Sequence, residues 1–148
     1  MNNTLTYIAD TGFLVAIFHP HDTYHAWAVK ELENIAQPLF TCEAVLTETT
    51  HLLRRYTKQG YDGFRASLAH TNWLQTPFSM ANNTSAVLNL LTQYDDTPMD
   101  FADACLVRMV EEYSPAQSRV LTIDSDFWVY RANQTQVIPL IIPPDRHS

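Results

Sequence analysis

The chain has 148 residues, enough for one domain that buries roughly 70% of the surface exposed by the unfolded chain. Its 16 acidic residues outnumber 9 basic ones, and the formal charge of −7 argues against wholesale binding of nucleic acid through a basic surface. Only Gly12, Gly60 and Gly63 are glycines, so a P-loop and a dinucleotide-binding fingerprint, which both need clustered glycines, are excluded.

The two cysteines indicate the compartment rather than a site. Cys42 and Cys105 make neither a disulfide framework nor a zinc-binding pattern, so we expect two reduced core thiols in a cytoplasmic protein. The first residues, MNNTLTY, lack the basic and apolar segments of a signal peptide. No apolar stretch approaches the roughly 20 residues of a membrane span, and we expect no membrane association.

Apolar periodicity predicts strands that alternate with helices. In chain order we expect a strand over 5–10, helices over 11–18 and 22–36, a strand over 38–41, helices over 42–58, 61–72, 84–94 and 98–113, and strands over 119–123 and 137–142. This alternation indicates an α/β domain whose central parallel sheet of four to five strands is flanked by helices in three layers. Pro139 places the last strand at an edge of the sheet. The domain should span residues 1–142, with a frayed tail over 143–148.

Acidic side chains follow two of the predicted strands. Asp10 ends "YIAD" and Asp124 ends "VLTID", and parallel sheets bind ligands outside the carboxyl ends of their strands. Asp10 also precedes a helix, so capping is an alternative role. Asp126 follows two residues after Asp124. An Asx turn readily explains one of these two acids, but the presence of both is less easily explained. Thr122 shares a strand face with Asp124 and should orient a carboxylate or a bound water.

Three further acids lie on predicted helices. Glu48 falls at the margin of an apolar stripe and has no basic residue four positions later, which favours a half-buried carboxylate in need of a cation over a solvated surface residue. Thr97 as N-cap and Pro98 in the first turn give Asp100 a capping role. Asp103 should then lie in the second turn without such a role, which makes it the stronger functional candidate.

Carboxylates that converge on one cleft repel one another unless a cation lies between them. Mg²⁺ suits this ligand type, because it is a hard ion that prefers carboxylate oxygens, and Mn²⁺ is a possible substitute. Such a site acts on phosphoryl groups by activating water and neutralising the charge that develops on phosphate oxygens. The predicted ligands are Asp10, Glu48, Asp103, Asp124 and Asp126.

Four stretches together resemble the PIN-domain ribonucleases, especially VapC-type toxins of bacterial toxin–antitoxin pairs. They are "IADTGFLVAIF", "VLTETTHLL", "DFADACLV" and "VLTIDSDF", they occur in the family's order, and the resemblance covers about residues 7–130. The resemblance implies a parallel sheet wrapped by helices and Mg²⁺- or Mn²⁺-dependent cleavage of RNA. It also implies a cognate antitoxin and a homodimer. Its four catalytic acids fall on Asp10, Glu48, Asp103 and Asp124, and an accessory acid falls on Asp126.

The resemblance leaves the contacts with RNA open. Arg54, Arg55 and Lys58 lie on the outer face of the predicted helix that carries Glu48, and they are candidate RNA-binding residues, although a solvated helix face explains them equally well. His25 in "DTYHAW" matches a histidine of many such toxins, and we expect it to be structural. The spacing after Asp124 is one residue shorter than in some relatives, so the role of Asp126 stays undetermined.

Other functions fit the residues less well. A phosphatase of the haloacid dehalogenase type needs a second Asp at position 12, which is Gly12, and a response-regulator receiver needs a lysine near a late strand, whereas no lysine follows Lys58. The remaining alternative is a catalytically silent PIN-like module for interaction or RNA binding. The leading hypothesis is a metal-dependent endoribonuclease, held inactive by a partner protein.

Overall fold

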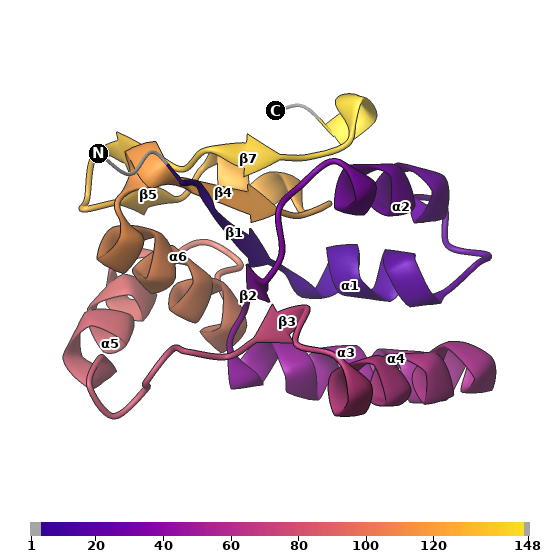
Figure 1. Ribbon diagram of the computed structural model, residues 1–148. Coiled ribbons are helices and arrows are strands. Elements are labelled where there is room, and N and C mark those ends of the chain that lie inside the picture. The colour runs from indigo at the N-terminus through magenta and orange to yellow at the C-terminus, as the bar shows by residue number, and fades with distance from the viewer. Residues whose placement is uncertain (1–3, 147–148) are drawn as a thin grey trace.

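The computed structural model describes residues 4–146, and its centre is a parallel sheet of five strands in the order β3-β2-β1-β4-β7 (Figure 1). The strands are β1 (Thr6–Ala9), β2 (Leu39–Phe40), β3 (Leu74–Gln75), β4 (Ser118–Leu121) and β7 (Leu140–Ile141). The two longest, β1 and β4, lie side by side and pair from Thr6 with Ser118 to Ala9 with Leu121. The predicted parallel α/β sheet is therefore confirmed.

Six helices flank the sheet. They are α1 (Thr11–Phe18), α2 (His25–Glu33), α3 (Glu43–Tyr56), α4 (Lys58–His70), α5 (Thr84–Gln93) and α6 (Phe101–Tyr113). Figure 1 shows α5 and α6 together on one side of the molecule and α1 to α4 on the other. None of the helices within residues 4–146 has the length and apolar character needed to cross a membrane.

The end of the chain differs from the prediction. The expected strand over 137–142 is divided between β6 (Gln136–Val137), which pairs antiparallel with β5 (Arg131–Ala132), and β7 at the edge of the main sheet. Pro139 lies between the two, and its carbonyl accepts a hydrogen bond from Val120 N at 2.9 Å. A strand of two residues carries little periodicity, and β3 and β5 were missed for this reason, whereas β2 lies within the predicted strand over 38–41.

The expected fraying of the tail is wrong over residues 143–146. Pro144–Arg146 form a short 3-10 helix, and Arg146 Nε donates to Ile123 O at 2.9 Å. Trp128 Nε1 donates to Arg146 O at 2.9 Å, and Tyr24 OH donates to Asp145 at 3.0 Å. Residues 147 and 148 of the predicted tail lie outside the described residues.

The core is apolar and contains both cysteines. Cys42 and Cys105 are buried free thiols, as expected. His25 has the expected structural contact, because its Nδ1 lies 2.6 Å from Ala16 O. Trp27 packs edge-on against the buried Phe13. These contacts fix α2 on α1, and α1 leads directly from the central strand β1.

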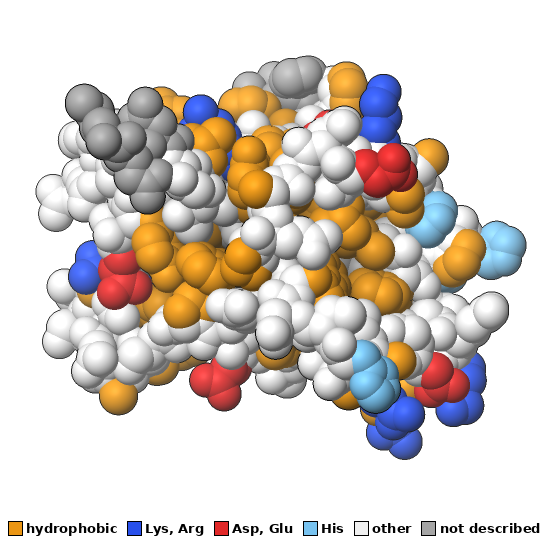
Figure 2. All heavy atoms as spheres, in the orientation of Figure 1, with side chains coloured by type: hydrophobic (Ala, Val, Ile, Leu, Met, Phe, Trp, Pro, Cys, Tyr) orange, Lys and Arg blue, Asp and Glu red, His pale blue; other side chains and the backbone are white. Residues whose placement is uncertain are grey.

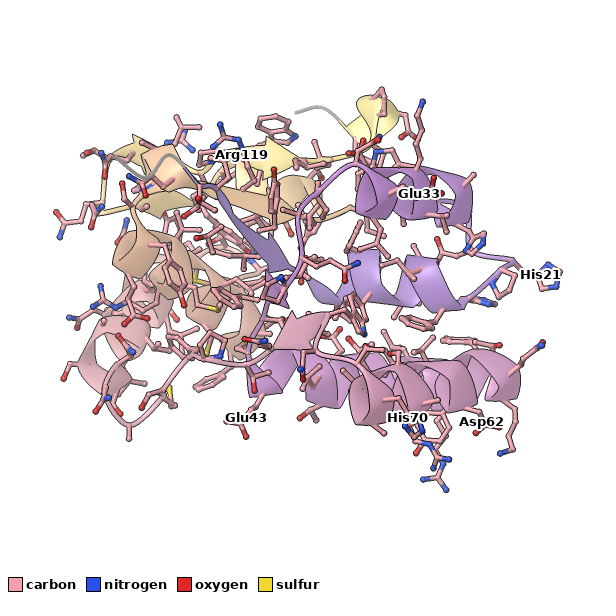
Figure 3. All side chains as sticks on the ribbon, viewed as in Figure 1. His21, Glu33, Glu43, Asp62, His70 and Arg119 are labelled. Carbon is pink, nitrogen blue, oxygen red and sulfur yellow. The ribbon has the colours of Figure 1, made fainter. Side chains whose placement is uncertain are left out.

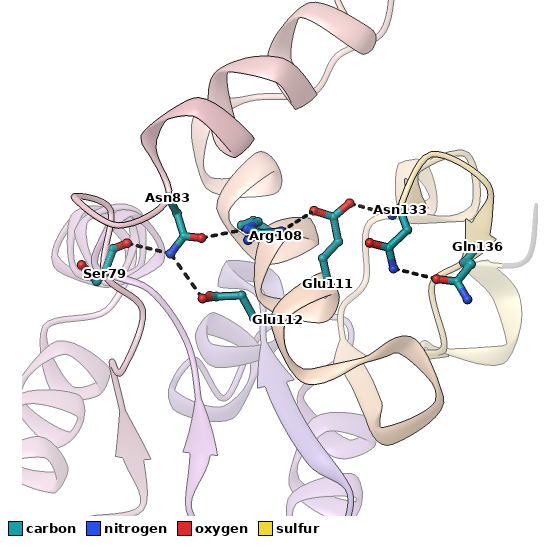
Figure 4. Close-up of polar contacts among 7 residues, drawn as sticks. All are labelled: Ser79, Asn83, Arg108, Glu111, Glu112, Asn133 and Gln136. Atoms are coloured by element: carbon teal, nitrogen blue, oxygen red, sulfur yellow. Dashed lines mark hydrogen bonds and ion pairs between the residues drawn. The ribbon is translucent and has the colours of Figure 1, made fainter.

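A chain of polar contacts ties the β5–β6 hairpin to α6 and α5 (Figure 4). Arg108 Nε donates to Asn83 Oδ1 at 2.8 Å, and Arg108 Nη1 lies 3.2 Å from Glu111 Oε1. Glu111 Oε2 accepts from Asn133 N at 2.7 Å. Asn133 and Gln134 have positive φ values of 50° and 71° in the short loop over residues 133–135 that joins β5 to β6.

Candidate active site

A cleft of about 470 Å³ opens at the carboxyl ends of β1 and β4, between α1 and α3. In the strand order, β2 and β3 lie on one side of β1, and β4 and β7 lie on the other. The strand order therefore reverses between β1 and β4, and an open α/β sheet forms its ligand crevice at such a switch point. All four predicted catalytic acids line it, as their positions in the sequence led us to expect. The lining residues are Asp10, Thr11, Gly12, Val15, His19, Asp22, Glu48, Leu52, Tyr56, Asp100, Asp103, Ile123 and Asp124.

Asp10 caps a helix and also faces the cleft. Its Oδ1 accepts from Thr11 N and its Oδ2 from Thr122 Oγ1, both at 2.7 Å. The pKa of Asp10 is raised to about 6, mainly by burial and to a smaller extent by the charges of Asp124 and Glu48. The two hydrogen bonds oppose this shift. The two roles considered from the sequence, capping and lining the site, are therefore compatible.

Thr122 joins the two acids that follow the central strands. Its buried hydroxyl donates to Asp10 and accepts from Asp124 N at 2.9 Å. Asp124 Oδ1 accepts from Asp126 N at 2.9 Å, and burial raises the pKa of Asp124 against the effect of this bond. Asp126 itself does not line the cleft but lies beside Asp124, close enough for its charge to raise the same pKa.

The positions of Asp100 and Asp103 in helix α6 differ from the prediction. Helix α6 begins at Phe101, so Asp100 is the N-cap and Asp103 lies in the first turn. Asp103 N donates to Asp100 Oδ1 at 2.8 Å, and Asp100 N donates to Asp103 Oδ2 at 3.3 Å, which makes a capping box. Thr97 does not cap the helix, because its hydroxyl donates to Tyr94 O at 2.8 Å. Thr97 and Asp100 could both serve as the N-cap. The prediction placed the cap at Thr97, whereas the structure places it at Asp100.

Asp103 also faces inward toward the cleft. It is buried, and Tyr130 OH donates to its Oδ2 at 3.1 Å. Burial is the main cause that raises the pKa of Asp103 to about 8, and the charges of Asp100 and Asp10 contribute to the same shift. At neutral pH this carboxyl group therefore holds a proton in the metal-free protein.

Glu48 lies at the mouth of the cleft. The expectation of a half-buried carboxylate is wrong, because Glu48 is exposed and the buried face of α3 consists of Val45, Thr49 and Leu53. Thr11 Oγ1 donates to Glu48 Oε2 at 3.3 Å, and this contact holds the carboxylate against the start of α1. Glu48 thus reaches the site from the solvent side.

The donor set of the cleft fits a hard divalent cation. It consists of oxygen atoms from Asp10, Glu48, Asp103 and Asp124, and the pKa values of Asp10 and Asp103 are raised first by burial and then by the charges of neighbouring carboxylates. Among residues 4–146, no three His, Cys, Asp or Glu side chains converge closely enough to form a ready-made metal site. In this arrangement the carboxylates instead accept hydrogen bonds from hydroxyl and backbone groups, and a cation would have to draw them together.

The three candidate RNA-binding residues are not equivalent. Arg55 lies with its guanidinium 5.5 Å from the ring centre of Tyr56, which lines the cleft. Arg54 instead contacts the ring of Tyr61 at 6.0 Å, and Lys58 pairs with Asp62 at 3.2 Å. All three are exposed, but only Arg55 adjoins a residue of the cleft. On the face shown in Figure 2, the described basic side chains are scattered and form no continuous patch.

Sequence reasoning missed several residues of the site. Tyr130 is separated from Asp103 by 27 positions, and no local pattern links the two. His19 and Asp22 come from the loop after α1, whose path depends on tertiary packing. Tyr56 carried a usable signal, because Glu48, Leu52 and Tyr56 are spaced by four residues and so share one helix face.

The raised pKa of Asp103 predicts how an Asp103→Asn variant should behave without metal. The unfolded carboxyl group ionises near pH 3.8 and the folded one near pH 8, so the wild type loses stability as the pH rises through this window. The variant has no such loss and can still accept the hydrogen bond from Tyr130. Its gain in free energy of unfolding over the wild type should grow from below about 1 kcal/mol at pH 4 to about 5 kcal/mol at pH 8, since each pH unit between the two pKa values contributes about 1.4 kcal/mol.

Chemical denaturation in chelator across this pH range measures the difference. Asp95→Asn is the control, because Asp95 is exposed and lies outside the cleft. A variant less stable than the wild type at pH 8 would show that Asp103 has a structural role that needs its charge.

Comparison with known proteins identifies the family. The model of the PIN domain family matches residues 7–127, most of the chain and all four acidic positions. The chain belongs to the PIN domain family. No match is found for this PIN domain among curated protein sequences.

Two solved structures share the fold of this PIN domain. One is the Mycobacterium tuberculosis toxin VapC20, described as cleaving the sarcin–ricin loop, with a TM-score of 0.73 and 20% sequence identity over 90% of this chain and 100% of that chain. The other is VapBC2 from Rickettsia felis, bound to a DNA fragment from its promoter, with a TM-score of 0.59 and 15% identity over 93% and 98% of the two chains. At these identities the likeness shows the fold, which agrees with the predicted VapC-like architecture.

Proposed function

We propose that this PIN domain is a metal-dependent endoribonuclease and the toxin of a toxin–antitoxin pair. The observation that carries the proposal is the meeting of Asp10, Glu48, Asp103 and Asp124 in one cleft at the carboxyl ends of the central strands. The structural relatives add support, because VapC20 is described as a toxin that cleaves the sarcin–ricin loop and VapBC2 as bound to a DNA fragment from its promoter. The proposed site needs no Ser, Cys or His nucleophile.

In the proposed mechanism Mg²⁺ or Mn²⁺, when bound, would activate water and neutralise charge on the scissile phosphate. Asp10, Asp103, Asp124 and Glu48 would hold it. Burial of Asp10 and Asp103 keeps water away from part of the site and strengthens the attraction of their carboxylates for positive charge. The hydroxyls of Thr122 and Tyr130 would fix the orientation of Asp10 and Asp103, in the way that outer hydrogen bonds orient metal ligands.

The partners in the proposal are RNA, a cognate antitoxin and a second copy of the chain. With a net charge of −7, attraction of RNA has to come from local groups, of which Arg55 is the nearest to the cleft among the three basic candidates. Trp27 packs on Phe13 within the chain and is half-buried there, so it offers no fully exposed ring to a second copy. The homodimer therefore rests on the family resemblance.

The proposed function is tested by incubating purified protein with a single-stranded RNA in Mg²⁺, Mn²⁺, Ca²⁺ or chelator. Cleavage is expected with Mg²⁺ and Mn²⁺ and not with Ca²⁺, which holds oxygen ligands more loosely, or with chelator. Equal cleavage in chelator would overturn the metal-dependent mechanism. RNA binding without cleavage in any metal would favour the silent RNA-binding module.

A further inference from the structure

We propose that the end of the cleft remote from the carboxylates, formed by Tyr56 and His19, binds an unpaired nucleobase of the RNA by stacking. The proposal rests on the proposed ribonuclease function and names a part of the substrate. It assigns a task to residues that the carboxylate chemistry does not use.

The cleft is elongated because two helices line it in the same direction. Asp10 precedes α1 and His19 follows it, while Glu48 and Tyr56 lie eight residues apart on α3. Thr11 contacts Glu48 at one end, and His19 faces Tyr56 at the other. Eight residues of helix span about 12 Å, so Asp10 and Glu48 lie at the end opposite the aromatic rings. Asp22, which also lines the cleft, lies at the aromatic end, where its N–H donates to His19 O at 2.9 Å.

The remote end of the cleft, called the aromatic wall below, consists of the rings of Tyr56 and His19 and is open to solvent at Tyr56. Tyr56 is 59% exposed, which is unusual for a large ring that lines a concave site. The rings of His19 and Tyr56 are nearly parallel, with an angle of 14° and centres 6.5 Å apart. Within residues 4–146 the buried Nδ1 of His19 has no hydrogen-bond partner, so ring packing rather than a polar anchor places this side chain. Figure 3 shows the adjoining His21 at the tip of the loop between α1 and α2.

The wall combines stacking surface with positive charge. The guanidinium of Arg55 lies over the ring of Tyr56, 5.5 Å from its centre, although Arg55 itself does not line the cleft. Arg55 is also seven residues from Glu48, on the same side of α3. Among the residues that line the cleft, Val15 and Leu52 are apolar, and they separate the wall from the acids. An aromatic ring beside an arginine suits a base and its phosphate.

An unpaired base is the ligand that fits these groups. Proteins recognise single-stranded RNA by stacking its exposed bases on aromatic rings, whereas bases inside a duplex are covered by their neighbours. Stacked nucleotides are spaced by about 3.4 Å, so a base at Tyr56 would lie about two to four nucleotides from a phosphate at Asp10. The proposed role of the wall is therefore to position a single strand across the carboxylates.

The experiment measures the affinity for a fluorescent single-stranded oligoribonucleotide in chelator, where cleavage does not interfere. Tyr56→Leu should weaken binding about 10-fold, since stacking of one base on a ring contributes about this factor, and Tyr56→Phe should bind within about 2-fold of the wild type. Tyr61→Leu is the matched control, because Tyr61 also lies beside arginines but does not line the cleft. In a series of oligonucleotides that each lack one base, one should bind the wild type more weakly than the intact oligonucleotide does. The same abasic position should not weaken binding to Tyr56→Leu.

The outcomes separate this proposal from the nuclease itself. Equal binding by Tyr56→Leu and the wild type would overturn the stacking site even if the RNA is cleaved normally. Loss of affinity in Tyr56→Leu together with the abasic effect would support it even if no metal promotes cleavage. In an active enzyme, Tyr56→Leu should raise KM about 10-fold with kcat nearly unchanged. A fall in kcat alone would contradict a binding role.

Discussion

Asp10→Asn is expected to reduce metal-dependent cleavage of RNA more than about 100-fold, a loss larger than that caused by removing a group that only orients a metal ligand. Asn keeps one oxygen that can accept from Thr11 N, and it is a good N-cap, so α1 should remain intact. Its amide nitrogen would face Thr122 Oγ1, a hydroxyl that can accept as well as donate. The change therefore removes the negative charge and reverses one hydrogen bond. Single-turnover rates at saturating Mg²⁺, together with thermal melting, test this separation of activity from stability.

Three further variants give this prediction its controls. Thr122→Val keeps the shape of the side chain but removes the hydroxyl that contacts Asp10 and Asp124, and it should cost about 10- to 100-fold in activity. Asp126→Asn should be milder than Asp124→Asn, because Asp124 lines the cleft and Asp126 does not. Equal losses at positions 124 and 126 would show that Asp126 belongs among the ligands.

Gly60→Ala is expected to destabilise the protein by about 3 kcal/mol or more, at the upper end of the effects of overpacking. A Cβ at this position would lie 2.1 Å from the backbone oxygen of Phe18 and 2.7 Å from Thr57 Cγ2. A backbone oxygen cannot turn aside as a side chain can, so α1 and α4 would have to move apart. Urea denaturation of the two proteins measures the loss.

Gly63→Ala on the same helix is the matched control. Its Cβ would have Phe18 Cδ1 as its nearest neighbour, at an ordinary contact distance of 3.7 Å. Alanine favours a helix over glycine by up to about 1 kcal/mol, so this variant should be as stable as the wild type or more stable. If both substitutions are tolerated alike, the close approach of α4 to Phe18 does not exist in solution.

The sequence predicted the larger elements well because they are long and periodic. Helices α3 and α6 and the paired strands β1 and β4 lie where the apolar pattern places them. Four acids at strand ends or helix margins were enough to predict a common cleft, since topology alone brings carboxyl ends of parallel strands to one edge. Short elements such as β3 and β5 failed because two residues of pairing depend on their neighbours rather than on their own periodicity.

Details of the site failed for a different reason. The exposure of Glu48 is decided by how α3 rotates against its neighbours, which a helical wheel alone does not fix. The partner of Asp103 in the cap was ambiguous, because Thr97 and Asp100 both offered an acceptor. Contacts such as Tyr130 with Asp103 join distant segments, and only the folded chain reveals them.

The last described residues of the chain support the cleft through contacts with residues far away in the sequence. Arg146 holds the carbonyl of Ile123, the residue that precedes Asp124 and itself lines the cleft. Asp145 reaches Tyr24, just beyond the loop that carries His19 and Asp22. Residues 145 and 146 thus hold segments at both ends of the cleft, and proteolysis before Pro143 would release these contacts while all four candidate metal ligands stay in the chain.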